Sequence, residues 1–376
     1  MAIISNITFS NVIMKKRIIW ITADYFIDVD CLLVPYLQQN YAEEFQIDWY
    51  VIKTTGNNIP ISNTPKQIFT LKHRGKDPRI ILDYMIIFKS MNFKEADIIY
   101  SDFVGVPYYY FILSYYNKRK VPLIHAAHNV IPFAVWPKML IWYVDKVFRY
   151  NQHFQLFSKF TSDYFRNHYS GKSSFYCPMI LKSYGEVQTD NYKIDRSKLN
   201  LLFFGNVIAN KRLDLLISAI KHLPEKYRDK VHLNICGKCN NPTPFMKDIE
   251  ESPNITAYFK RIDDEEVAEL FTKHDFLMLP YQDVAQSGPH MIAYNYNLPV
   301  IASDIDGFTE RVIDGENGFL FKVNDETDLI KTIIKAIKMD VNSRNRMKNN
   351  LQTYSQNNYG LHVISQKYIN YFNSII

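Results

Sequence analysis

The sequence of 376 residues contains no run of about 18 apolar residues, so no helix that crosses a membrane is predicted. Its first stretch, MAIISNITFSNVIMKK, has no early positive charge, and polar residues interrupt the apolar ones, unlike a secretory signal peptide. Low-complexity segments are also absent. We therefore expect a cytoplasmic protein in which residues 1–13 form a disordered extension.

Cysteine is scarce, with only Cys31, Cys177, Cys236 and Cys239, which argues against a disulfide framework and for a reduced compartment. Cys236 and Cys239 form a CxxC pair, but no second pair or histidine pair stands nearby to complete a zinc site. We expect two cysteines at the end of a strand; a redox or metal role is the minor alternative.

The excess of positive charge is small, at +6 with a pI near 8.8. It suits an anionic lipid headgroup, an acidic surface or a phosphate-bearing ligand, and it predicts no nucleic-acid partner. Aromatic residues reach 15%, and residues 104–150 combine them with lysine and arginine. That combination is typical of the interface of an anionic membrane, and helices packed in an ordinary core are an equal alternative.

Apolar runs of four to six residues alternate with helical patterns in both halves of the chain. Such runs predict parallel strands covered on both faces, so we expect an α/β protein with two Rossmann-like, doubly wound domains that face across a cleft. The expected strands are Arg17–Thr22, Ile47–Ile52, Asp97–Ser101, Pro122–Ala126, Gln155–Ser158, Leu199–Phe204, His232–Cys236, Asn254–Tyr258, Phe276–Pro280, Pro299–Ala302 and the run GFLFKV.

The domain boundaries follow from a polar stretch, SYGEVQTDNYKIDRSK, between the two halves. We expect a first domain over 14–183, a linker over 184–198 and a second domain over 199–345. A C-terminal helix over 346–376 is expected to pack back on the first domain.

The stretch QSGP at 286–289 lies where a buried strand should turn into a helix. Ser287 or Gly288 suits the N-cap, and Pro289 suits the first helical position. The free amides of such a helix end attract anions and hydroxyl-rich ligands. An ordinary connecting loop is the alternative.

Several motifs follow one another along the second half: FFGNVIANKRLDLLISAI, ICGK, HDFLMLPY and QSGPHMIAYNYNLPVIASDIDGFTERVIDGENGFLF. Over residues 200–340 their order and spacing resemble the donor domain of GT-B glycosyltransferases in the large retaining family four. The resemblance implies a nucleotide-sugar co-substrate and no metal or other cofactor. No Asp-x-Asp metal site is convincing, and the Asp-x-Asp at 28–30 is expected in a loop of the other domain.

The resemblance also implies roles for donor-binding residues. Gly205 lets the pyrophosphate approach the backbone, and Lys211 neutralises it; a solvated lysine at a helix start is the alternative for Lys211. Asn206 stands where the family often has arginine. Arg212 stands where glycine is usual and would restore some of that charge.

Two glutamates that most family members share are missing, because Val284 and Ile292 occupy their positions. A subgroup with QSG in this loop also lacks the second glutamate. The resemblance to that subgroup implies that Gln286 and Ser287 contact sugar or phosphate oxygens and that Gly288 leaves its amide open.

Two residues are candidates for the catalytic machinery by the same resemblance. His128, after the run PLIHAAH, would face the donor sugar, with a satisfied loop histidine as the alternative, whereas His125 is expected in the core. Glu310 stands where the family usually has an acidic residue, and contact with the cleft and capping of a helix are equal alternatives.

Together these features predict a retaining glycosyltransferase that moves a sugar from a nucleotide-sugar donor to a growing, lipid-linked glycan in cell-surface polysaccharide synthesis. It would be cytoplasmic and peripheral on the inner face of the cell membrane. One alternative is a small soluble acceptor; another is a catalytically silent GT-B subunit that binds a partner protein.

Overall fold

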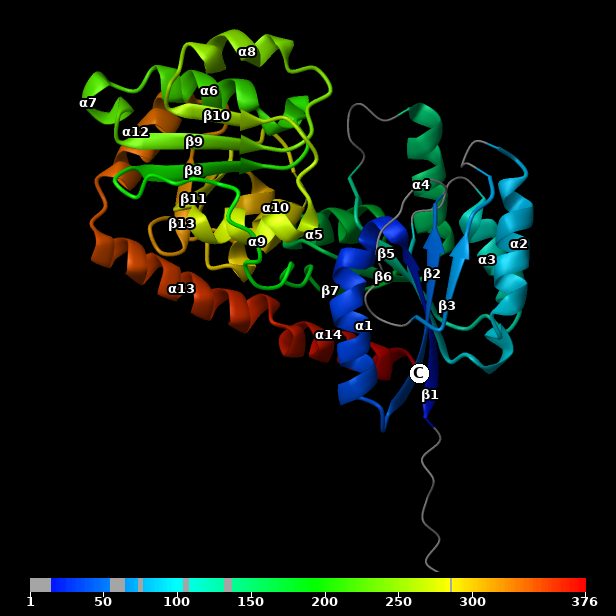
Figure 1. The fold of residues 1–376 in the computed structure, drawn as a ribbon. Helices are drawn as coiled ribbons and strands as arrows, with labels where there is room; N and C mark the ends of the chain where they lie inside the picture. Colours follow the sequence, from blue (N-terminus) through cyan, green and yellow to red (C-terminus); the bar gives the residue numbers. More distant parts are fainter. Residues whose placement is uncertain (1–14, 55–64, 74–76, 104–107, 132–136, 285) are drawn as a thin grey trace, which may run out of the picture.

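The computed structural model describes residues 15–54, 65–73, 77–103, 108–131, 137–284 and 286–376. The expected extension over 1–13 lies outside this part of the chain. The described residues form two domains, each with one parallel sheet between layers of helices (Figure 1). The predicted pair of Rossmann-like domains is confirmed.

The first domain has a seven-stranded sheet in the order β3-β2-β1-β4-β5-β6-β7, with every pair parallel. The strand order reverses direction on either side of β1, which creates the crevice where ligands bind in such sheets. The elements are β1 (Lys16–Ala23), α1 (Ile27–Asn40), β2 (Phe45–Lys53), β3 (Gln67–Thr70), α2 (Ile80–Ser90), β4 (Ile98–Asp102), α3 (Tyr109–Tyr116), β5 (Leu123–Ala127), α4 (Lys138–Tyr150), β6 (His153–Leu156), α5 (Lys159–His168) and β7 (Ser173–Tyr176).

The second domain has a six-stranded parallel sheet in the order β10-β9-β8-β11-β12-β13, with the same reversal around β8. Its elements are β8 (Leu199–Phe204), α6 (Leu213–Lys221), α7 (Glu225–Arg228), β9 (Val231–Cys236), α8 (Thr243–Glu250), β10 (Ile255–Tyr258), α9 (Asp264–Lys273), β11 (Phe276–Leu279), α10 (Gly288–Asn295), β12 (Val300–Ser303), α11 (Asp306–Thr309), β13 (Gly318–Phe321) and α12 (Glu326–Ile337).

Each sheet has a hydrophobic core on both faces, because successive side chains of a strand point to opposite sides. In β1, Ile19 and Ile21 pack with α2, α3 and α4, whereas Ile18 and Trp20 pack with α1 and the C-terminal helix. In the second domain one core lies under α6 and α12 and the other under α9 and α10. Both faces are therefore apolar, which explains the unbroken apolar runs of the strands.

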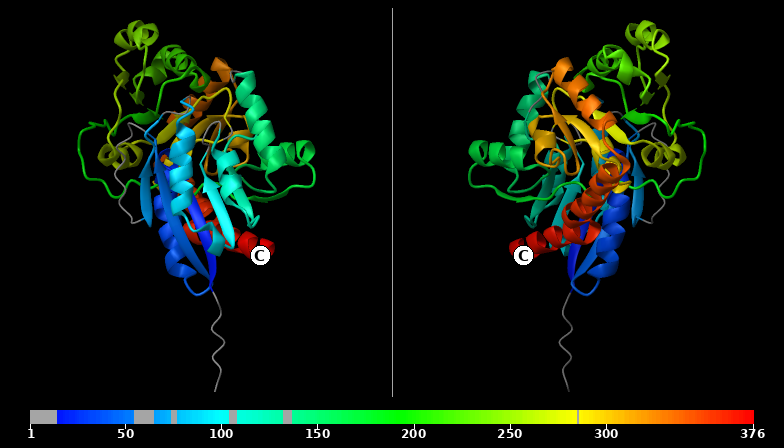
Figure 2. Two further views of the ribbon diagram at one scale, coloured as in Figure 1. Left: turned by 90° about the vertical axis from the view of Figure 1, so that its right-hand side faces the viewer. Right: turned by 90° about the vertical axis from the view of Figure 1, so that its left-hand side faces the viewer.

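The chain ends in two helices, α13 (Val341–Tyr359) and α14 (Leu361–Ile375), where one helix over 346–376 is expected. The break falls at Gly360, whose backbone is extended. α13 packs against α10 of the second domain, and α14 joins the core of the first, so the pair bridges both domains (Figure 1; the same two helices are red in Figure 2). No helix in the described part of the chain is both long and apolar enough to cross a bilayer.

The segment over 184–198 has no regular structure and is fastened to α9. Glu269 of α9 accepts hydrogen bonds from the hydroxyl of Thr189 and from the backbone amides of Asn191 and Tyr192, at 2.5, 2.9 and 2.7 Å. Tyr192 is buried in the core of the second domain. The segment is therefore anchored to the second domain.

Candidate active site between the domains

A cavity of about 380 Å³ lies between the two domains. Tyr25, Phe26 and His128 of the first domain line it opposite Lys211 and Gln286 of the second. A second cavity, of about 390 Å³, continues along the ends of β8 and β9. The two cavities share Lys182, Ile208, Lys211, Gly288 and Pro289, so they form one cleft.

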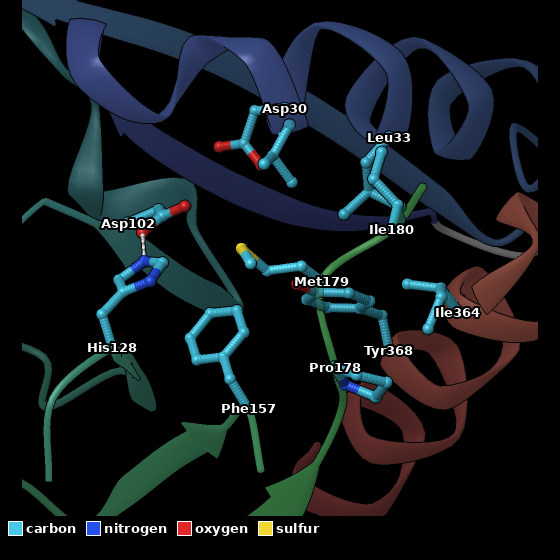
Figure 3. Close-up of a pocket in the computed structure, with 11 residues that line it drawn as sticks. Asp30, Leu33, Asp102, His128, Phe157, Pro178, Met179, Ile180, Ile364 and Tyr368 are labelled. Carbon is cyan, nitrogen blue, oxygen red and sulfur yellow. Dashed lines mark hydrogen bonds and ion pairs between the residues drawn. The ribbon is translucent and has the colours of Figure 1, made fainter. Parts of the chain in front are cut away.

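His128 follows β5 and is held by three contacts. Its ring stacks on Phe26, with centroids 3.8 Å apart, and on Phe157, at 4.3 Å. Its Nε2 lies 2.6 Å from Oδ1 of Asp102 (Figure 3). Because a carboxylate only accepts hydrogen bonds, Nε2 carries the proton, and Nδ1 is the nitrogen left for a ligand. His125 is a core residue bonded to Tyr110, as expected, and burial lowers the pKa of His125 to about 3.

Asp102, the last residue of β4, is a site residue that the sequence analysis missed. Its side chain is 4% exposed, and β4 lies beside β5, which brings the carboxylate to the histidine. Behind the pair, a void of about 10 Å³ is also lined by Asp30. The expected loop over 28–30 is wrong: Asp28 and Asp30 lie in the first turn of α1, and Asp30 accepts from Trp20 Nε1 at 2.9 Å.

The QSGP stretch forms the start of α10, as one reading of the sequence predicts. Ser287 is the N-cap, and its hydroxyl accepts from the amide of His290 at 3.3 Å. Gly288 presents bare backbone to the cleft, because an added Cβ would meet only Lys182 Nζ, 3.6 Å away. Gln286 reaches across the cleft and donates from Nε2 to the His128 carbonyl at 3.1 Å. Its buried Oε1 has no partner among the described residues, which leaves an acceptor for a hydroxyl donor.

Lys211 lies in the cleft beside Gly205 and is not a solvated lysine. Gly205 has a φ of 105°, which favours glycine, and a Cβ there would lie 2.8 Å from Lys211 Nζ, so any other residue would also displace the ammonium. Nζ lies 5.3 Å from the ring centroid of Tyr281. Among the described residues, none of the ion pairs involves Lys211, and burial lowers the pKa of Lys211 to about 8. A buried cation without a counter-ion is suited to an anionic ligand.

The affinity for a nucleoside diphosphate is expected to fall as the pH rises above 8. Lys211 has its ordinary pKa of 10.5 in the unfolded chain and one of about 8 in the folded protein. It therefore loses its proton at a lower pH in the folded protein than in the unfolded chain. A bound diphosphate favours the charged lysine, so binding above pH 8 must take up a proton, and the association constant should drop by up to about tenfold per pH unit. Calorimetric titration from pH 7 to 10 measures this decline, which Lys211→Met should abolish; a decline that persists in Lys211→Met would assign it to another group.

Asn206 lines the second cavity, but Arg212 and Glu310 line neither part of the cleft. Arg212 has a φ of 48° and forms an ion pair with Asp214. Such a left-handed backbone is one that glycine adopts without strain. Glu310 accepts from the amide of Lys159 at 2.8 Å, at the start of α5 in the other domain, so it caps a helix rather than lining the cleft.

Lys182 is a second residue that the sequence analysis missed. It lies just before the segment over 184–198, lines both parts of the cleft and forms an ion pair with Asp28 of α1. Its side chain is 12% exposed. Among the described residues, no group of three or more His, Cys, Asp or Glu side chains is placed to hold a metal ion.

Residues 186–354 match the family described as "Glycosyl transferases group 1". The chain is 22% identical, over 78% of its length and 83% of the other, to an "Uncharacterized 41.2 kDa protein in cps region" of Klebsiella pneumoniae. Its fold is similar to that of a sucrose-phosphate synthase from Thermosynechococcus elongatus, with a TM-score of 0.73, 14% identity and coverage of 96% and 99%. It is also similar to Anabaena HepE in complex with UDP and glucose, with a TM-score of 0.70, 14% identity and coverage of 96% and 100%. The chain is a glycosyltransferase with the GT-B fold, and residues 186–354, which include its second domain, match the glycosyl transferases group 1 family.

Proposed function

We propose that this glycosyltransferase moves a sugar, with retention of anomeric configuration, from a nucleotide-sugar donor to a growing, lipid-linked glycan. The observation that carries the donor part is the convergence of Lys211, the start of α10 and His128 on one cleft. Its similarity to Anabaena HepE, whose structure holds UDP and glucose, supports a nucleotide-sugar donor. The Klebsiella relative encoded in a cps region supports a role in polysaccharide synthesis.

The chemistry requires charge stabilisation on one side of the sugar and positioning on the other. The bond between the anomeric carbon and the phosphate oxygen breaks, and its electron pair stays on the diphosphate. Lys211 and the amides at the start of α10 stabilise that charge. The acceptor oxygen bonds to the anomeric carbon on the same face and gives its proton to the departing phosphate oxygen. His128, fixed by Asp102 and two phenylalanines, orients the sugar. No step in this scheme needs a metal.

The donor is identified by a thermal-shift screen of nucleotide sugars, followed by a turnover assay. A ligand at a hundred times its dissociation constant stabilises the fold by about 2.7 kcal/mol, so the true donor should raise the melting temperature clearly. Hydrolysis or transfer of that sugar supports the proposed enzyme. Binding without any turnover would contradict it and favour a catalytically silent subunit.

A groove on the outer side of the first domain supports an acceptor at a membrane. It has a volume of about 1160 Å³ and lies between α2 and α3. Leu82, Ile86 and Tyr115 line it and are 57%, 65% and 64% exposed. Lys118 and Arg119 also line it. Exposed apolar side chains with basic neighbours suit the headgroup region of an anionic bilayer.

Replacing Leu82 and Ile86 together by serine is expected to weaken binding to vesicles that contain phosphatidylglycerol. Removing two apolar side chains from such an interface should lower the partition coefficient about 100-fold, since each contributes on the order of 1.5 kcal/mol. Sedimentation with vesicles measures the change. Val341→Ser on α13 is the matched control, because Val341 is 69% exposed outside the groove. Equal binding by the double variant and wild type would remove this groove from the membrane interface.

A further inference from the structure

The first turn of α10 has two ammonium groups beside it, one more than the proposed chemistry uses. Lys182 Nζ lies 3.6 Å from the position of a Cβ added at Gly288. Lys211 Nζ and Pro289 Cγ lie 2.8 and 3.7 Å from the position of a Cβ added at Gly205. Both lysines line both parts of the cleft. An anion at the start of α10 would therefore lie near two lysines that come from different segments of the chain.

The two lysines differ in what holds them. Lys211 is buried in the second domain, and none of its partners among the described residues is a carboxylate. Lys182 is paired with Asp28, which lies in the first turn of α1 in the first domain. Oδ1 of Asp28 is buried and has no hydrogen-bond partner among the described residues. The Asp28 side chain is 37% exposed, and Lys182 is its only ion-pair partner among the described residues, so any anion that draws the lysine away competes with the carboxylate.

We propose that Lys182 is a second phosphate ligand in the cleft and that Asp28 competes with the diphosphate for it. This inference rests on the proposed function. In the free protein the Asp28 carboxylate holds the ammonium; in the complex the ammonium shifts toward the diphosphate while Asp28 is left more weakly paired. A nucleoside diphosphate carries more than one negative charge at neutral pH, so one lysine and a helix end leave part of that charge unbalanced. Because Asp28 belongs to the first domain, the exchange also makes diphosphate binding sensitive to a residue across the cleft.

The proposal predicts opposite effects for the two members of the pair. Lys182→Met should weaken binding of a nucleoside diphosphate about tenfold, because a charge-assisted contact is lost. Asp28→Asn should strengthen the same binding about threefold or more, because a neutral amide holds the ammonium less firmly. The measurement is calorimetric titration at pH 7 with UDP, GDP and ADP, each compared with its monophosphate. The effect of Lys182→Met should be larger for the diphosphate, which presents the additional anionic group.

Lys221→Met serves as the control, because Lys221 pairs with Asp248 outside the cleft; it should bind every nucleotide as wild type does. The proposal is overturned if Lys182→Met binds the diphosphates as wild type does. It is also overturned if Lys182→Met and Asp28→Asn lose affinity equally, because the ion pair would then be a purely structural link. Failure of the proposed function is a different result, in which wild type itself binds none of the three diphosphates. Unfolding curves of each variant identify any affinity loss that comes from misfolding. If Lys182→Met misfolds, Asp28→Asn still shows whether loss of the carboxylate raises or lowers the diphosphate affinity.

Discussion

Gly288→Val is expected to abolish binding of the nucleotide sugar and leave the protein folded. The backbone of Gly288 lies outside the left-handed region, and a Cβ there would contact only Lys182 Nζ, at 3.6 Å. The damage is therefore local, because a branched side chain fills the space in which the sugar approaches the first amides of α10. Losing that approach should cost at least about 100-fold in affinity, or about 2.7 kcal/mol.

The comparison of two ligands makes this test specific. The bare nucleoside diphosphate is also held by Lys211 beside Gly205, so its affinity for Gly288→Val should fall less than that of the nucleotide sugar. Gly288→Ala places one methyl group at the same point and should have an intermediate effect. Gln286→Ala should weaken sugar binding by roughly 0.5–1.5 kcal/mol, the worth of one hydrogen bond. If Gly288→Val binds the nucleotide sugar as wild type does, the start of α10 is only a structural turn.

The central strands of both sheets could be predicted to within one or two residues because both faces are buried. Leu199–Phe204 is predicted and observed with the same bounds, and it lies in the middle of its sheet. The edge strands Gln67–Thr70 and Ser173–Tyr176 were missed. Their residues are mostly half-buried or exposed, so no continuous apolar run marks them in the sequence.

Site residues within one local motif were predictable, whereas contacts between distant segments were not. Ser287 as the N-cap follows from helix-capping rules that involve only neighbouring residues, whereas Pro289, expected at the first helical position, is the second residue of α10. Asp102 meets His128 across 26 positions because β4 and β5 are adjacent. The sequence does indicate this contact, because Asp102 directly follows the apolar run DIIYS, His128 follows the next predicted strand, and parallel strands end at the same edge of a sheet. The role of Glu310 depends on α5 of the other domain, which no local pattern identifies.

His128→Phe is expected to reduce turnover by about 100-fold or more, the range found when a positioned polar group beside the reacting atoms is removed. Phenylalanine is the informative replacement, because its ring can keep the stack between Phe26 and Phe157 while both ring nitrogens are lost. Affinity for the nucleoside diphosphate should stay within about threefold of wild type, because Lys211 and α10 bind that part. The substitution also leaves Asp102 buried without its partner, which should lower the free energy of unfolding by about 3 kcal/mol.

Asp102→Asn separates the effect on turnover from the effect on stability. An amide oxygen still accepts from Nε2, so the single variant should lose only about tenfold in turnover. In the His128→Phe background the same change replaces an unpaired buried carboxylate by a neutral amide, so part of the lost stability should return. Turnover should not fall further, because Asp102 acts only through His128 and the two effects are therefore not additive. Steady-state kinetics and urea unfolding of wild type, both single variants and the double variant give the double-mutant cycle for turnover and for stability. Wild-type turnover by His128→Phe, or additive losses in the double variant, would show that this histidine and its carboxylate do not orient the sugar as a unit.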